Sequence, residues 1–238
     1  MSKFQTLERP KVDPAAGGFY TAKEAARLLN IGQPSRVVAW LQGRSNTATG
    51  PVIARQYNPI GGVQELGFWD LLEVRFIDHF RKQGVSLQAL RKAAETARKE
   101  LKQQHPFALS RARFLTDRKT IFLATARELD DTVLLDLVTK QFAMYEVLEE
   151  IIERGLVFHP ATGLAQEWRP RPVELPAIAI NPKIAFGQPV VTPAGVPTSA
   201  LFLSWKAEAG NYRAIADWFE IEQDLVHQAV EFELGLAN

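Results

Sequence analysis

The sequence predicts an α+β, mainly helical protein of three domains, and two observations carry this prediction. Apolar residues recur at helical spacing in long segments, and these segments are separated by short extended runs bounded by turn residues. Charge also changes along the chain: lysine and arginine outnumber aspartate and glutamate by 16 to 9 in residues 1–104, whereas residues 198–238 carry 2 against 7. We therefore expect an N-terminal domain over 1–104, an α+β middle domain over 105–175 and a C-terminal helical domain over 176–238.

Composition excludes several classes of protein. The 238 residues are 46% hydrophobic and 23% charged, which is typical of an ordinary folded chain, and cysteine is absent. Disulfides, thiolate metal sites and cysteine nucleophiles are therefore excluded. The N-terminal segment lacks the apolar core of a signal peptide, and no apolar run approaches the roughly 20 residues that a membrane span needs. We expect a cytoplasmic protein without membrane contact.

Two helices joined by a tight turn are predicted near the N-terminus. Thr21 is placed as the N-cap of the first helix, and Glu24 occupies the capping-box position. A break at residues 30–32 follows, and Pro34 is well placed near the start of the second helix. This arrangement is typical of a helix-turn-helix.

The segments that follow complete a predicted winged helix-turn-helix. Residues 52–57 and 63–68 are extended runs separated by a turn-rich Asn-Pro-Ile-Gly-Gly loop, which predicts a β-hairpin. A strongly apolar helix is expected from Phe68 to near Gly84, and a further helix begins at the Ser86 cap.

These motifs resemble a known family. The stretches YTAKEAARLLNI, PSRVVAWL and FWDLLEVRFIDHFRKQGVSLQALRKA, over roughly residues 19–103, look like the DNA-binding domain of MerR-like regulators. The resemblance implies that this domain binds double-stranded DNA. One departure concerns the recognition helix, where the family usually places arginine before an aromatic residue and this chain has Ala39 before Trp40. The family's base preference therefore does not carry over.

The side chains expected to contact DNA lie on both helices and on the wing. Gln33, Ser35 and Arg36 stand at the start of the second helix, from which side chains can reach base edges. A single copy would neutralise few phosphates, so we expect a homodimer that reads two half-sites in its own promoter. The alternative is a plain helical hairpin whose arginines are solvated. The residues expected to meet phosphates are Lys23, Arg27, Arg44 and Arg55.

The middle domain is predicted to be α+β. Residues 107–117 and 118–125 are expected to form one hairpin, and residues 154–170 a second that turns at 159–163. A long amphipathic helix is expected over 133–155, and no long coiled coil is predicted. Four acidic residues share one face of that helix, best explained as a solvated face: Glu146, Glu149, Glu150 and Glu153.

The C-terminal domain is predicted to begin with an extended strap and to end with three helices. Five prolines between residues 170 and 189 exclude a regular helix there. Helices are expected over 198–210, 211–219 and 221–236. Their acidic balance would repel DNA, so we expect their apolar side chains to face a protein partner or a second copy: Trp205, Trp218, Phe219, Val226 and Phe232.

This domain also resembles a known family. INPKIAFGQPVV, then GVPTSAL and a three-helix tail, over residues 178–236, are similar to a short antitoxin family commonly paired with PIN-like nuclease toxins. An arginine usual after the second glycine is missing, because Gly195 is followed directly by Val196. A MerR-like domain joined to this tail resembles the longer VapB-type antitoxins. The positions that fall on the pattern are Pro182, Ile184, Gly187, Pro189, Val191, Gly195, Val196 and Pro197.

The antitoxin resemblance implies a PIN-like toxin protein as partner. Such a nuclease gathers carboxylates around divalent metal, so an inhibitor can use arginines that pair with carboxylates. Arg169 and Arg171 lie in the strap, and Lys183 is a further candidate. The alternative is that these are solvated linker residues.

An enzyme is not predicted. The four histidines lie in different segments without metal-ligand spacing, and no phosphate-binding loop or nucleophile motif is found in the sequence. We therefore expect no catalytic residue, no metal site and no cofactor. The competing function is a free-standing MerR-like regulator whose middle domain binds a small ligand, with Phe142, Phe158 and Trp168 around the pocket.

Overall fold

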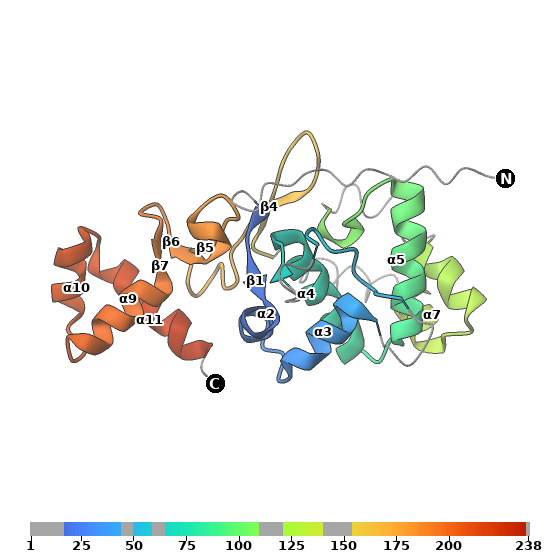
Figure 1. Ribbon diagram of the computed structural model, residues 1–238, viewed down its shortest axis with the longest axis horizontal. Coiled ribbons are helices and arrows are strands. Elements are labelled where there is room, and N and C mark those ends of the chain that lie inside the picture. The colour runs from blue at the N-terminus through green and yellow to red at the C-terminus, as the bar shows by residue number, and fades with distance from the viewer. Residues whose placement is uncertain (1–16, 44–49, 59–64, 110–120, 140–153, 237–238) are drawn as a thin grey trace.

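The computed structural model describes residues 17–43, 50–58, 65–109, 121–139 and 154–236. The fold is α+β, as the sequence predicts. Figure 1 shows a small sheet between helices α9, α10 and α11 at one end of the molecule and helices α2 to α7 at the other. No helix in these described ranges is long and apolar enough to cross a membrane.

The predicted helix-turn-helix is confirmed as a local structure. Strand β1 (Tyr20–Thr21) leads into α2 (Ala22–Leu28), and α3 (Pro34–Gln42) follows. Thr21 Oγ1 accepts the Glu24 N–H at 3.2 Å, and the Glu24 carboxylate accepts the Thr21 N–H at 2.7 Å, so the capping box is complete. Trp40, on the inner face of α3, is buried and occupies the core.

The predicted wing hairpin is wrong in its first strand. Residues 51–57 have no strand conformation, and β2 (Glu65–Leu66) pairs antiparallel with β1 instead. Val52 and its neighbour Ile53 are both buried, which excludes the alternation of a half-exposed strand. The Val52 N–H bonds to the Trp40 carbonyl at 2.9 Å, and the Val52 carbonyl accepts a hydrogen bond from Arg98, so this segment packs against helices. Residues 63–64 of the predicted second strand lie outside the described residues.

Two long helices support this unit. Helices α4 (Phe68–Lys82) and α5 (Leu87–Leu101) have the predicted starts, and Ser86 Oγ caps α5 by accepting the Ala89 N–H at 3.1 Å. The apolar face of α4 fills the centre of the larger core, to which a short 3-10 helix η1 (Pro106–Ala108) adds Phe107.

The hairpin predicted over 107–117 and 118–125 is wrong where the structure describes it. Residues 121–128 are helical, and η1 takes the place of the start of the first strand. Ile121, Phe122 and Ala126 are buried, which is the spacing of one helical face. The helix predicted over 133–155 is confirmed only in its first part, as α7 (Thr132–Thr139). Residues 140–153, with the four glutamates, lie outside the described residues, and residues 154–155 form a turn.

A five-stranded antiparallel sheet follows, in the order in which its strands occur along the chain. The predicted hairpin over 154–170 is confirmed. The proline-rich segment contains no α-helix in its described residues, as predicted, but it forms the last three strands rather than a free strap. The sheet spans the expected boundary at residue 175, so the division into middle and C-terminal domains stays a prediction. The strands are β3 (Leu156–Phe158), β4 (Ala165–Trp168), β5 (Ile178–Ile180), β6 (Pro189–Val191) and β7 (Val196–Pro197).

Three helices complete the chain, as predicted: α9 (Thr198–Ala207), α10 (Tyr212–Phe219) and α11 (Gln223–Gly235). They form a second hydrophobic core with β5 and β6. Val226 and Phe232, expected to face a partner, are buried in this core, whereas Trp218 is 62% exposed.

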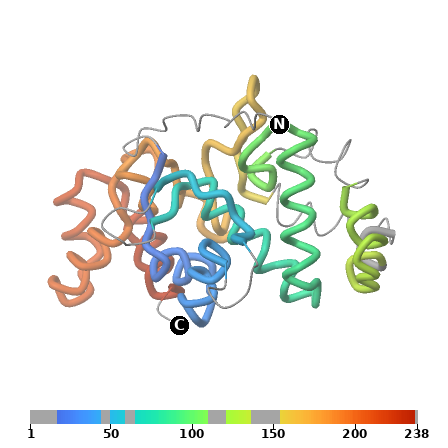
Figure 2. The backbone as a smooth tube through the Cα atoms, turned by 45° about the vertical axis from the view of Figure 1, so that its right-hand side comes forward, coloured from blue at the N-terminus to red at the C-terminus, as the bar shows by residue number. Residues whose placement is uncertain are grey.

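The two cores are joined through the N-terminal strand. The Phe19 N–H donates to the Phe186 carbonyl at 2.9 Å, and the Tyr20 hydroxyl donates to the Gly187 carbonyl at 2.7 Å. Gly187 has a φ of +84°, and a Cβ there would lie 2.4 Å from the Tyr20 hydroxyl. In both Figure 1 and Figure 2 the end of α11 lies beside α2, so the C-terminal helices and the helix-turn-helix are in contact.

Candidate nucleic-acid interface

The start of α3 presents three polar side chains to solvent. Gln33, Ser35 and Arg36 are all exposed, and they lie within the first turn of the helix. Within the described residues, the side chain of the N-cap Gln33 makes no capping hydrogen bond, which leaves its amide available to a ligand. The helix N-terminus adds a partial positive charge. This arrangement suits contact with a polyanion.

Two side chains, Trp40 and Asp78, position the guanidinium of Arg36. Its guanidinium carbon lies 5.4 Å from the centre of the Trp40 ring, and Nη2 lies 3.8 Å from Asp78 Oδ1. Asp78 belongs to α4 and also pairs with Lys82 at 2.7 Å. Because the Arg36 side chain is still 44% exposed, it is oriented without being withdrawn from solvent.

Arg27, expected to meet a phosphate, has an intramolecular partner instead. Its Nη2 lies 2.6 Å from Oε2 of Glu233 on α11, and the other carboxylate oxygen of Glu233 accepts the Thr198 hydroxyl at 2.6 Å. Glu233 is buried, whereas the Arg27 side chain is 45% exposed. This ion pair joins α2 to the C-terminal helices. A phosphate contact by Arg27 stays a prediction.

The other residues expected to contact phosphates have different surroundings. Lys23 is exposed on α2, and Arg55 is half-buried in the segment that precedes the wing loop. Arg44 lies outside the described residues.

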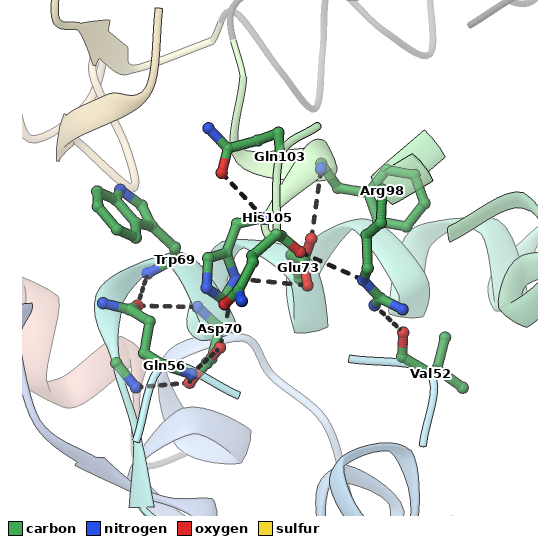
Figure 3. Close-up of polar contacts among 11 residues, drawn as sticks. Val52, Gln56, Trp69, Asp70, Glu73, Arg98, Gln103 and His105 are labelled. Atoms are coloured by element: carbon green, nitrogen blue, oxygen red, sulfur yellow. Dashed lines mark hydrogen bonds and ion pairs between the residues drawn. The ribbon is translucent and has the colours of Figure 1, made fainter. Parts of the chain in front are cut away.

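A buried polar cluster lies beneath the interface, and Figure 3 shows its members. The Asp70 carboxylate accepts the Gln56 N–H at 3.0 Å and the Gly67 N–H at 2.9 Å. Gln56 Oε1 in turn accepts the Trp69 N–H at 2.7 Å. These bonds fasten the loop over residues 51–57 to the start of α4, so the support of α2 and α3 depends on charged groups inside the core.

Three ionisable groups meet in this cluster. His105 Nδ1 lies 3.6 Å from Asp70 Oδ1 and 3.7 Å from Glu73 Oε2, and all three side chains are buried. Burial raises the pKa of Asp70 to about 6, although the charge of His105 and the two backbone hydrogen bonds oppose it. Burial lowers the pKa of His105, but the Glu73 and Asp70 carboxylates outweigh it and the pKa of His105 is raised.

We expect the free energy of unfolding to decrease as pH rises through the folded pKa values of Asp70 and His105. The pKa of Asp70 is higher in the folded chain than its ordinary 3.8, so its contribution is full at low pH and is lost as pH rises to about 6. The pKa of His105 is also raised, so its contribution is present below 6.5 and is lost above its folded pKa. Two pH units for Asp70 amount to about 3 kcal/mol. Denaturation at pH 5 and pH 8 measures about half of the Asp70 contribution, because pH 5 lies about one unit below its folded pKa.

Asp70→Asn is the variant that tests this prediction, because it removes one of the titrating groups. It should flatten the dependence of unfolding free energy on pH, whereas Asp130→Asn, at an exposed position, should keep the slope of the original chain. An unchanged slope in Asp70→Asn would refute the role of this carboxyl group.

Acidic residues on an otherwise apolar helix indicate this cluster in the sequence, although hydrophobic periodicity by itself does not. Helix α4 is buried on most of its surface, and three acidic residues lie on the buried part of it: Asp70, Glu73 and Asp78. Carboxylates on an apolar helix face need partners. His105, just before Pro106, is the nearest histidine in sequence after α4 and supplies one.

The residues expected to bind a toxin also have different surroundings. Arg169 is used within the chain, since Nε donates to Glu167 Oε1 at 3.0 Å and Nη1 to the Pro176 carbonyl at 2.6 Å. Arg171 lines a cavity described below, and Lys183 is exposed. Trp168, expected in a ligand pocket, is a buried core residue under the guanidinium of Arg75, and Phe142 lies outside the described residues.

Comparisons with curated proteins and with solved structures each give a similar chain. No family model matches the sequence. A protein of Mycobacterium tuberculosis (strain ATCC 25618 / H37Rv) named "Putative antitoxin VapB45" is 24% identical over 229 residues, which cover 89% of this chain and 92% of that protein. The crystal structure of Rv2018 from Mycobacterium tuberculosis superimposes with a TM-score of 0.65 at 22% identity and covers 89% of this chain and 96% of that one. This chain and Rv2018 therefore share a fold.

Proposed function

We propose that this chain is the DNA-binding antitoxin of a type II toxin–antitoxin system. In this proposal a homodimer binds double-stranded DNA in its own promoter and represses its operon, and the chain neutralises a PIN-like nuclease. The observation that carries the proposal is the extent of the similarity to the antitoxin-named mycobacterial protein, which covers 89% of this chain and 92% of that protein. The similarity therefore extends beyond any single predicted domain of the chain.

DNA is assigned to α3 and its neighbours. The exposed Gln33, Ser35 and Arg36 are suited to base edges, since glutamine and arginine can each make paired hydrogen bonds to purines. Lys23 supplies a nearby phosphate contact, and Arg55 and Arg44 remain proposed contacts from the wing side. Because residues 198–238 carry seven acidic and two basic residues, we assign that end of the molecule to protein contacts.

Nuclease binding is assigned to the C-terminal part of the chain, from Arg169 to the last helix. Of the cations proposed to pair with the carboxylates of the nuclease, Lys183 is exposed and Arg171 has no ion-pair partner among the described residues. Arg169 would have to give up its bonds to Glu167 and Pro176 first. The exposed Trp218 offers an apolar contact on the same end of the molecule.

Arg36→Ala is expected to weaken binding to promoter DNA by about 10- to 100-fold, because one arginine that contacts a base is worth about 1–3 kcal/mol. Fluorescence anisotropy with a labelled promoter duplex measures this at a fixed salt concentration. Arg213→Ala, at an exposed position on α10, is the matched control and should bind like the original chain. Equal affinity of both variants would exclude Arg36 from the interface.

A further inference from the structure

A cavity of about 550 Å³ lies between α4, the segment that follows β4, and α11. Its volume is within the range of small-molecule sites, roughly 300–1,000 Å³. Its walls come from both parts of the molecule, since α4 supports the helix-turn-helix and α11 belongs to the C-terminal core. The side chains that decide its chemistry are Arg75, Lys82, Arg154, Arg171, Asp78 and Glu231.

Most charges in this wall are already paired. Lys82 binds Asp78 at 2.7 Å, and Arg154 lies 3.7 Å from Glu174, where both side chains are more than half exposed. Arg75 is fixed by its position 5.1 Å from the centre of the buried Trp168 ring. These contacts hold three cations around the cavity in defined positions.

Arg171 differs from the other cations. It has neither a carboxylate at ion-pair distance nor a side-chain hydrogen bond within the part of the chain that the structure describes. A half-buried guanidinium without an acceptor has lost part of its hydration without compensation. Among the described residues, this cation therefore lacks a counter-ion.

The backbone around Arg171 is constrained. Prolines 170 and 172 flank it, and its carbonyl accepts the Leu175 N–H at 2.8 Å. The guanidinium reaches the end of α11 over Gly235, where a Cβ would lie 2.5 Å from Nη2. Glycine thus leaves the space that this guanidinium occupies.

We propose that this cavity binds a small organic anion through carboxylate or phosphate oxygens. Arg171 binds one anionic group, and Arg75 and Lys82 on α4 meet the other end of the ligand. The site is distinct from α3 and goes beyond the proposed antitoxin function. The anion bridges the two hydrophobic cores, because its ligands come from α4 and from the segment before β5.

Isothermal titration calorimetry of the full chain tests the site, with citrate and inorganic phosphate as probes and chloride adjusted to constant ionic strength. We expect one site per chain for at least one of the two anions. Arg171→Gln should weaken that binding by about 10-fold or more, since a charge-assisted hydrogen bond is lost. Arg213→Gln is the matched control on α10 and should leave the affinity unchanged.

A variant of opposite sign tests the electrostatic contribution of the cavity wall, whereas Arg213→Gln controls for net charge. Glu231 is an exposed carboxylate of the same wall, so Glu231→Gln should strengthen anion binding. If circular dichroism shows that Arg171→Gln is unfolded, Lys82→Gln takes its place. The proposal is overturned if neither anion binds at millimolar concentration, or if the wall variants bind like Arg213→Gln. Neither result bears on DNA binding. Because Arg171 is also a proposed nuclease contact, nuclease binding is measured separately, in the absence of both anions.

Discussion

Replacing Arg27 by alanine is expected to lower the free energy of unfolding by about 2–3 kcal/mol. The substitution removes the cation that lies 2.6 Å from the Glu233 carboxylate and leaves that buried charge with the Thr198 hydroxyl. A buried charge without its partner typically costs about 3–5 kcal/mol, and the value is smaller here because the Arg27 side chain is 45% exposed. Chemical denaturation at neutral pH measures the loss.

Lys23→Ala is the control for this experiment, because Lys23 is an exposed cation on the same helix. Its effect should stay within about 0.5 kcal/mol. Glu233→Gln should cost less than Arg27→Ala, since an amide can still bond to Thr198 and no charge remains buried. If Arg27→Ala and Lys23→Ala are equally stable, the ion pair between α2 and α11 does not hold the two parts together.

Phe122→Ala is expected to have the largest effect on stability, about 3–5 kcal/mol. Phe122 is buried, and its ring lies 5.8 Å from Phe80, 6.1 Å from Phe107 and 6.2 Å from Phe76. Truncation leaves a cavity among aromatic rings of α4 and η1 that cannot all move inward. Thermal or chemical denaturation, followed by circular dichroism, measures the effect.

The matched control is Val133→Ala, which removes apolar atoms from a side chain that is 39% exposed. It should cost less than about 1 kcal/mol. The comparison also tests whether residues 121–128 pack on α4, because an exposed Phe122 ring would lose little on truncation. A loss below 1 kcal/mol in Phe122→Ala would contradict the packing of this segment on α4.

Local signals in the sequence were sufficient for most helices. The capping box at Thr21 and Glu24, the Pro34 start and the Ser86 cap each act within one helical turn, so their residues determine the helix start without help from distant contacts. The β3–β4 hairpin was also predictable, because its turn at residues 159–163 contains proline and glycine between two apolar runs.

The predictions of secondary structure were wrong where the conformation of a segment depends on contacts with helices distant in sequence. The apolar run at residues 121–126 is too short to separate a buried strand from a buried helix by its spacing, and the contact with α4 decides the matter. Residues 51–57 have β-forming side chains, but both Val52 and Ile53 are buried and their backbone bonds to α3 and α5. Tertiary contacts therefore override strand propensity.

The candidate interface shows the same division. Exposure of Gln33, Ser35 and Arg36 follows from the helical period of α3 once its buried face is known. The partners of the cations do not follow from any local pattern: Arg27 and Glu233 are 206 residues apart, and Arg36 meets Asp78 from another helix. The sequence therefore identifies the basic residues, whereas only the folded chain shows which of them already pair with a carboxylate.

The most direct test of the proposed antitoxin function is co-expression of this chain with the protein encoded beside its gene, which the proposal requires to be a PIN-like nuclease. We expect the nuclease alone to stop growth, and the two proteins together to permit growth, to copurify and to show no nuclease activity in a purified complex. The same complex should shift a duplex of its own promoter, with an affinity that falls steeply as salt rises. Full nuclease activity in the presence of excess chain, with no copurification, would contradict the proposal.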